Sequence, residues 1–143
     1  MKCVNELKMT LDSKSVNAGF AREAVSAIVT SLDPNIEELT DIKTAGSEAV
    51  TNCVVHGYAE REGKIYITVS IFEKDFVRIR IRDRGAGIEN VEKAMEPLFT
   101  TAGGERAGLG FAVMESFMDK VRVKSAPDMG TTVVLEKKVR GKR

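Results

Sequence analysis

The segment "SEAVTNCVVHG", residues 47–57, ends a long stretch of helical periodicity and carries three polar side chains on one side. Glu48, Asn52 and His56 are spaced i, i+4 and i+8, which aligns them along one helical face over roughly 12 Å. The apolar residues between them would pack against a sheet. The segment therefore predicts a core helix with a carboxylate and an amide at the border of the core.

The helix that contains this segment is predicted to begin near Pro34. Asp33 and Pro34 suit the N-cap and first helical position, and the glutamates that follow favour the positive end of the helix dipole. Apolar residues then recur near the helical period as far as Gly57, which we interpret as a C-cap. These apolar residues are Ile36, Leu39, Ile42, Ala49, Val50, Cys53 and Val54.

The residues before this helix predict a strand and a first helix. Alternating apolar residues indicate a strand over 3–11, and Ser13 or Ser15 can cap a helix that runs to about Leu32. The apolar stripe of that helix is predicted to be Phe20, Ala24, Ala27, Ile28 and Val29.

Two hairpins and two helices are predicted after Gly57. Strands over 65–71 and 77–81 are joined by "EKD", and Arg78, Arg80 and Arg82 alternate with apolar residues on the second strand. A short helix near 89–96, a helix in "LGFAVMESFMD" and a closing hairpin of 121–125 and 131–137 follow, and the basic tail "KKVRGKR" is predicted to fray.

Composition limits the class of protein. A chain of 143 residues has the length of one domain, so we expect residues 1–143 to form a single unit. A net charge of +1 provides no overall field for nucleic acid or membranes, and Cys3, Cys53 and one histidine cannot make a structural zinc cluster. No apolar run approaches the roughly 20 residues that span a bilayer, so we expect a cytoplasmic location.

Glu48 and Asn52 form the first candidate site. A carboxylate at the core border can act as a general base, and an amide oxygen one turn later suits magnesium beside phosphates. The alternative is that both are boundary polar residues satisfied by solvent or backbone, because i+4 spacing is common by chance. For His56, a capping or packing role is favoured over acid-base chemistry.

Two glycine-containing segments are further candidates. In "RDRGAG", residues 82–87, Asp83 ends a strand and could accept a hydrogen bond from the amine of adenine, although for this segment alone an ordinary Asp-Gly turn is the favoured explanation. In "GGERAGLG", Gly108 and Gly110 precede a helix whose exposed amides could meet a phosphate. The segment matches neither a Walker P-loop nor a dinucleotide fingerprint.

Taken in order, these elements resemble the GHKL superfamily of ATPases and kinases. Glu48, Asn52, His56 and Gly57 correspond to its N box, "RDRGAG" to its first glycine box and "GLG" to its second. "GTTV", residues 130–133, is similar to its closing-strand motif. The resemblance implies a two-layer α/β sandwich with a mixed, mostly antiparallel sheet that helices cover on one face.

Within the superfamily, the chain is most similar to the small anti-sigma factor kinases. "FARE", "EPLFTT" and "ERAGLGFAVMESFMD" look like stretches of that family, and the likeness covers nearly the whole chain. It implies a magnesium-dependent serine kinase that uses ATP, or holds ADP. Its implied partners are a sporulation sigma factor, an anti-anti-sigma factor as phosphoacceptor, and a second copy of the chain paired through sheet surfaces; nucleic acid and membranes are not expected.

The resemblance also assigns site residues. Glu48 is the implied base, Asn52 the metal ligand, and Arg22 a partner contact. Arg106 is adjacent to the implied γ-phosphate, although a solvated loop arginine is an equal alternative. The implied nucleotide-binding residues are Asn52, Asp83, Gly85, Gly87, Thr100, Thr101, Gly108, Leu109, Gly110 and Thr132. A nucleotide-dependent binding module without transferase activity and a free-standing ATPase are the alternative functions.

Overall fold

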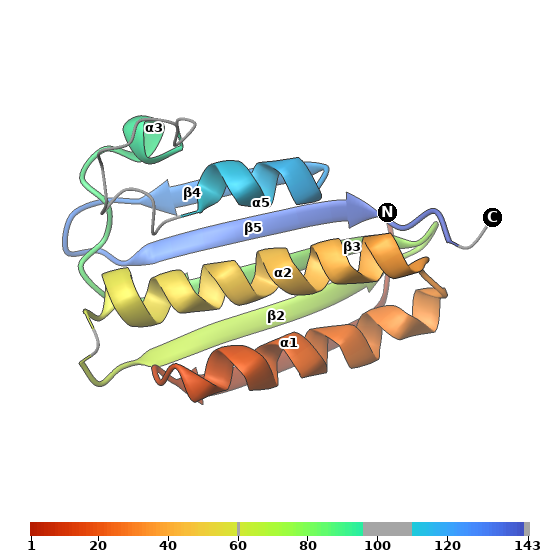
Figure 1. The fold of residues 1–143 in the computed structure, drawn as a ribbon, viewed down its shortest axis with the longest axis horizontal. Coiled ribbons are helices and arrows are strands. Elements are labelled where there is room, and N and C mark those ends of the chain that lie inside the picture. Colours follow the sequence, from red (N-terminus) through yellow and green to blue (C-terminus); the bar gives the residue numbers. More distant parts are fainter. Residues whose placement is uncertain (60, 96–109, 142–143) are drawn as a thin grey trace.

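A computed structural model describes residues 1–59, 61–95 and 110–141 of the chain (Figure 1). Its strands are β1 (Cys3–Asp12), β2 (Lys64–Phe72), β3 (Phe76–Asp83), β4 (Lys120–Ser125) and β5 (Thr131–Lys138). Its helices are α1 (Val16–Val29), α2 (Ile36–Asn52), α3 (Val91–Ala94) and α5 (Phe111–Phe117), with a 3-10 turn, η1 (Thr30–Leu32), and a π-helical turn, η2 (Cys53–Gly57). No helix among these residues is long and apolar enough to cross a membrane.

The five strands form one sheet in the order β1-β2-β3-β5-β4, and each neighbouring pair of described strands is antiparallel. Helices α1, α2 and α5 lie on the same side of this sheet (Figure 1). The expected two-layer sandwich is therefore confirmed.

Strand register separates the side chains of the sheet into two faces. From Asn5 onward, odd-numbered residues pair with odd-numbered residues and even with even in all four ladders. Odd-numbered side chains such as Ile67, Ile79 and Leu135 are buried under the helices. Because neighbouring side chains alternate across a strand, even-numbered residues occupy the other face, as predicted for Arg78, Arg80 and Arg82.

Helix α2 begins two residues later than predicted. Asn35 is the N-cap: its side chain accepts from Glu38 N at 2.8 Å, and the Glu38 carboxylate accepts from Asn35 N at 3.0 Å. Such a reciprocal capping box satisfies two free amides of the first turn. Asp33 instead has a left-handed backbone conformation, φ 54°, at the end of η1, so the assignment of Asp33 and Pro34 as helix start was wrong.

The predicted buried side of α1 was also partly wrong. Phe20 is 56% exposed and Ala27 is exposed, whereas the buried residues are Ala18, Ala21, Val25 and Val29. Helix α1 packs closely against α2, and the small alanine side chains on this face permit the close approach. A phenylalanine on this face would hold the two helices apart.

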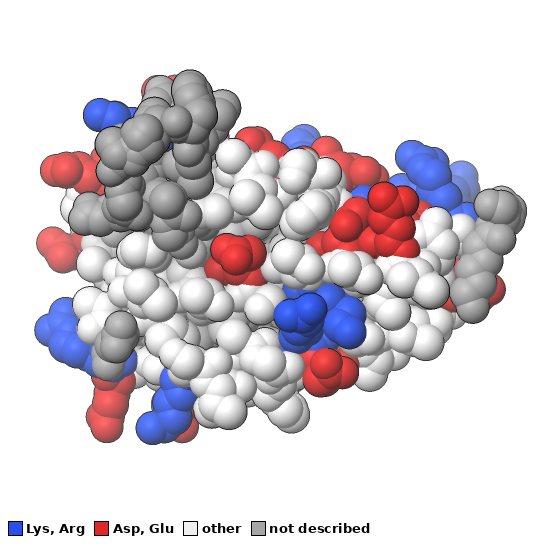
Figure 2. Space-filling view, viewed as in Figure 1, with Lys and Arg blue, Asp and Glu red and all other residues white. Residues whose placement is uncertain are grey.

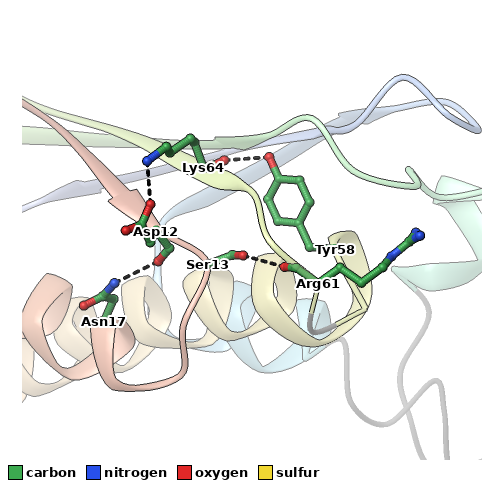
Figure 3. A network of polar contacts seen from close by, with 6 residues as sticks. All are labelled: Asp12, Ser13, Asn17, Tyr58, Arg61 and Lys64. Carbon is green, nitrogen blue, oxygen red and sulfur yellow. Dashed lines mark hydrogen bonds and ion pairs between the residues drawn. The ribbon is translucent and has the colours of Figure 1, made fainter.

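Neither proposed serine makes a side-chain cap for α1. Ser15 occupies the N-cap without a capping hydrogen bond, and Ser13 Oγ instead donates to Arg61 O at 2.8 Å (Figure 3). Asn17 Nδ2 reaches back to Asp12 O at 2.8 Å. The turn between β1 and α1 is therefore fixed by the loop after η2, a tertiary contact that local sequence does not reveal.

The basic tail does not fray over residues 137–141. Val139 is 1% exposed, and the amides of Arg140 and Gly141 donate to Glu38 at 2.6 and 3.0 Å. Burial raises the pKa of Glu38, but these two amides and that of Asn35 outweigh it and hold the pKa below its ordinary value. Glu38 thus joins the start of α2 to the chain after β5.

Replacing Glu38 with glutamine should lower the free energy of unfolding by about 2 kcal/mol at neutral pH, because three amides lose a charged acceptor. A depressed carboxyl pKa stabilises the fold above the unfolded-state pKa, ordinarily 4.5, and this stabilisation is lost as the pH falls through the folded-state value. Urea unfolding from pH 7 to pH 3 measures the difference. Exposed Glu37, in the same helical turn, supplies the control Glu37→Gln, which should change little; a Glu38 variant that loses the same stability at every pH would contradict the charged role.

Candidate nucleotide site

Asp83 is a buried carboxylate at the end of β3. It is 3% exposed, and its Oδ1 accepts from Gly85 N at 2.9 Å. The thiol of Cys53 and the backbone N–H of Thr131, like that of Gly85, act to lower the pKa of this carboxylate. Burial raises the pKa of Asp83 despite these donors. The arrangement orients the carboxylate and makes it a strong hydrogen-bond acceptor when charged.

Glycines allow the end of β3 to approach the end of the α2 and η2 helix. A Cβ on Gly57 would lie 2.8 Å from Asp83 Oδ2, and a Cβ on Gly85 would overlap the carbonyl of Gly57. That carbonyl accepts from Ala86 N at 2.7 Å. Gly57 is therefore required by this contact and not as a C-cap, because the turn ends at Tyr58.

Tyr58 ties the loop after η2 to the same strand end. Its hydroxyl donates to Lys64 O at 2.6 Å and accepts from Arg84 N at 2.8 Å. Lys64 also pairs with Asp12 at 2.5 Å (Figure 3). These contacts hold the residue after Asp83 in place from the β1–β2 side of the sheet.

A small cavity opens beside Asp83 between the sheet, α2 and α5. Its apolar lining includes Ile81, Phe111 and Val133, and its polar lining includes Asn52 and Thr131. The remaining lining residues are Ala49, Cys53, His56, Gly57, Asp83, Gly87 and Ile88. An oriented carboxylate acceptor between apolar walls has the chemistry to bind a planar base that carries an exocyclic amine, such as adenine.

Glu48 lies one helical turn before Asn52 and reaches the start of α5. Gly110, the N-cap of α5, has φ 62°, and a Cβ there would lie 2.7 Å from Glu48 Oε1. Glu48 is partly exposed, whereas Asn52 is 7% exposed. The N-box helix and the second glycine segment, far apart in sequence, therefore meet at this carboxylate.

The sequence and the fold are similar to those of known proteins. The chain matches the histidine kinase-like ATPase domain family over residues 11–137. It is 51% identical to an anti-sigma F factor of Clostridium novyi over 95% of this chain and 96% of that protein. It is 50% identical to an anti-sigma F factor of Bacillus subtilis, over 93% and 92% respectively.

The chain belongs to the anti-sigma F factor family. Its histidine kinase-like ATPase domain implies nucleotide binding. Solved structures share the fold: the RsbU and RsbW domains of a Mycobacterium tuberculosis protein have a TM-score of 0.69 at 23% identity, covering 95% of this chain and 32% of that one. A histidine kinase domain from Erythrobacter litoralis has a TM-score of 0.57 at 17% identity, covering 87% and 60%.

The structure of this anti-sigma F family member brings together some of the assigned residues. Asn52, Asp83 and Gly87 line the cavity, and Gly85 and Gly110 support it through close backbone approaches. His56 also lines it, at the last turn of η2. Five assigned residues lie outside the described part of the chain: Thr100, Thr101, Arg106, Gly108 and Leu109.

Two assignments lie away from the cavity. Thr132 pairs with Arg82 and therefore lies on the uncovered face of the sheet, whereas its neighbour Thr131 pairs with Asp83 and lines the cavity. Arg22 is exposed on α1. Thr131, and not Thr132, is thus the threonine of this motif that lines the cavity, because the strand register decides which of the two faces the helices.

Cys53 is a cavity residue that sequence reasoning treated only as a small apolar side chain. It is 3% exposed, and its thiol acts to lower the pKa of Asp83. Burial, together with the Asp83 charge, raises the pKa of this thiol, so it stays protonated and remains a donor. Its position next to Asn52 was visible, but its contact with a strand thirty residues later was not.

Gly85→Ala should lower the free energy of unfolding by about 2 kcal/mol, because the added methyl group would overlap the backbone of Gly57. Gly19→Ala is the matched control: it lies in α1 with nothing near a new Cβ, and should stabilise the chain by about 0.5–1 kcal/mol through helix propensity. Urea midpoints measure both. Equal stability of the two variants would show that the close approach at Gly85 is not required.

Proposed function

We propose that this chain is an anti-sigma factor that holds a sporulation sigma factor and, as an ATP-dependent protein serine kinase, phosphorylates and thereby inactivates an anti-anti-sigma factor. The observation that supports this most directly is that the two candidate carboxylates have different surroundings. Asp83 is buried at the base of an apolar cavity, and Glu48 is partly exposed at the N-terminus of α5. Recognition of the nucleotide base requires a buried, oriented acceptor, whereas proton transfer requires a carboxylate that the substrate can reach.

In this proposal Asp83 recognises the base. Its carboxylate accepts a hydrogen bond from the exocyclic amine of adenine, and the Gly85 N–H fixes its orientation. Ile81 and Phe111 cover the faces of the ring.

Glu48 takes the proton from the serine hydroxyl of the protein substrate. Asn52, one turn away, would hold the magnesium ion, which neutralises phosphate charge when bound. In this proposal Gly108, Leu109 and Gly110 approach the phosphates of the nucleotide. Thr100, Thr101 and Arg106, from the same segment of the sequence, contribute to the same site. For Arg106 the proposed role is stabilisation of charge on the transferred group.

The proposed partner surface begins at α1. Arg22 is exposed there, and Phe20 on the same helix is also exposed, so α1 offers both a cation and an apolar side chain to a protein partner. We further propose that the chain works in the cytoplasm as a homodimer. The names of the Clostridium novyi and Bacillus subtilis relatives support the sigma-binding part of this proposal.

A binding module without transferase activity is the second candidate. It would use Asp83 and the cavity in the same way and would need no base. The partly exposed carboxylate of Glu48 against the start of α5 favours the kinase, because a purely structural residue there would be expected to pair with a neighbouring side chain, and no such ion pair forms among the described residues.

The first experiment separates transfer from binding. With γ-labelled ATP and a purified anti-anti-sigma protein, wild type should label the protein, and Glu48→Gln should reduce transfer by about a thousandfold or more while nucleotide affinity changes little. Asp83→Asn should instead weaken nucleotide binding, measured by calorimetry, because an amide cannot reproduce the acceptor and its partners. Label released only as free phosphate, or equal loss of binding in both variants, would rule out the kinase assignment.

Sigma-factor capture is tested separately. Arg22→Ala should reduce co-purification of the sigma factor by about tenfold, as expected for loss of an interface arginine. Transfer of phosphate to water or to a free peptide should not change, because Arg22 lies outside the cavity. Lys14→Ala, an exposed cation just before α1, is the control; if it weakens capture as much as Arg22→Ala, the contact is not specific to Arg22.

A further inference from the structure

Ser125, the last residue of β4, lies behind the wall of the nucleotide cavity and contacts three other segments of the chain. Its hydroxyl accepts from Ile88 N at 2.8 Å and donates to Gly130 O at 2.9 Å. The same oxygen lies 2.8 Å from Thr131 Oγ1. Ile88 and Thr131 both line the cavity. Ser125 therefore holds two residues of the cavity wall through one hydroxyl group.

The hydrogens of this cluster satisfy every contact in only one arrangement. A serine hydroxyl has a single hydrogen, and a carbonyl can only accept, so the hydrogen of Ser125 is directed to Gly130 O. The contact between Ser125 Oγ and Thr131 Oγ1 then requires Thr131 to be the donor. Because its only hydrogen is directed to Ser125, the Thr131 hydroxyl offers the cavity an acceptor and no donor.

Strand register sets this hydroxyl beside the Asp83 carboxylate. Thr131 and Asp83 are directly opposite each other on β5 and β3, and both line the cavity. The Cβ atoms of such a cross-strand pair are about 5 Å apart. The pair thus presents two neighbouring acceptors to a bound base. The exocyclic amine of a 6-amino purine is a donor, whereas the carbonyl of a 6-oxo purine in the same place is an acceptor.

The β4–β5 turn holds the cluster against the loop that follows β3, at one end of the sheet (Figure 1). Asp128 N, in the turn, donates to Ala86 O, in the loop, at 2.6 Å. Gly130, with φ 79°, approaches the same loop so closely that a Cβ there would overlap the backbone carbonyl of Asp83. Because the two segments are in direct backbone contact, the Ser125 hydroxyl has a fixed position relative to Asp83.

Surface charge does not provide the same selectivity. On the side of the molecule that the helices cover, acidic and basic side chains of the described residues are scattered in small groups among uncharged ones (Figure 2). Nucleotides that differ only in the 6-substituent of the purine carry the same phosphates, so a charged surface would attract them equally. Discrimination between them therefore depends on hydrogen bonds inside the cavity.

We propose that Ser125 is a positioning residue for base recognition, which directs the Thr131 hydrogen away from the cavity so that Thr131 and Asp83 together select a 6-amino purine. This inference rests on the proposed function in one respect, that the base of the nucleotide occupies the cavity. Without the Ser125 hydroxyl, the Thr131 hydroxyl can rotate and donate to a carbonyl of the base. A 6-oxo purine then gains a partner that the wild-type cavity denies it.

The test compares the binding of ATP and of inosine triphosphate, a 6-oxo purine nucleotide, by calorimetry on the full chain without a partner protein. Ser125→Ala should lower the ratio of ATP affinity to inosine triphosphate affinity about tenfold, the effect of about one hydrogen bond. Ser125→Thr restores the hydroxyl and should return the ratio to within about twofold of wild type. Ser31→Ala is the matched control: Ser31 Oγ donates to Ile28 O at 2.7 Å in η1, away from the cavity, so the ratio should not change.

A second variant tests the same cluster if Ser125→Ala does not fold. Thr131→Val keeps the shape of the side chain and removes the acceptor, so it should also lower the affinity ratio. Equal weakening of both nucleotides by Ser125→Ala, an unchanged ratio in Thr131→Val, or no restoration by Ser125→Thr would overturn the role of Ser125 alone. If the wild-type chain bound neither nucleotide, the proposed function would fail as well, so the two failures are distinguishable.

Discussion

The contact between Gly57 and Asp83 is the constraint on which the site depends. A side chain on Gly57 would occupy the space of the Asp83 carboxylate. The Gly57 carbonyl also accepts a hydrogen bond from Ala86 N, in the turn that follows β3. This contact joins the end of the α2 and η2 helix to the end of β3, and so places Asn52 and Asp83 in one cavity. Its effect is to bury a carboxylate, which raises the pKa of Asp83, while the Gly85 N–H fixes the direction of that carboxylate.

Most of the fold could be predicted from the sequence because strand alternation is a local signal. The hairpin of β2 and β3 and that of β4 and β5 follow from alternating apolar residues and their turns. Helix ends were less predictable. Asn35 is the N-cap of α2 because it forms a capping box with Glu38, and the Glu38 carboxylate also accepts a hydrogen bond from the backbone of Arg140 in the tail. The docked tail shows why: a basic stretch gives no sequence signal for two backbone amides that meet a carboxylate a hundred residues earlier.

The site was predictable in outline and not in detail. Motif order made Asp83, Asn52 and Glu48 candidates, because each belongs to a short segment with recognisable spacing, and the structure brings Asp83 and Asn52 into one cavity. The choice between Thr131 and Thr132 could not come from "GTTV", since both have the same side chain and differ only in the face that the β3–β5 register gives them. The same physical reason hid the thiol contact of Cys53, which depends on how a helix end meets a strand end.

That register also connects the site to the opposite face. A single shift of β5 against β3 would exchange Thr131 for Thr132 beside Asp83, and would simultaneously turn Val133 outward and bring Val134 under the helices. The lining of the cavity and the side chains of the uncovered face are therefore two consequences of one pairing. Odd-numbered residues form the apolar core and include the buried carboxylate of Asp83, and the even-numbered residues beside them can carry charge because no described helix covers them.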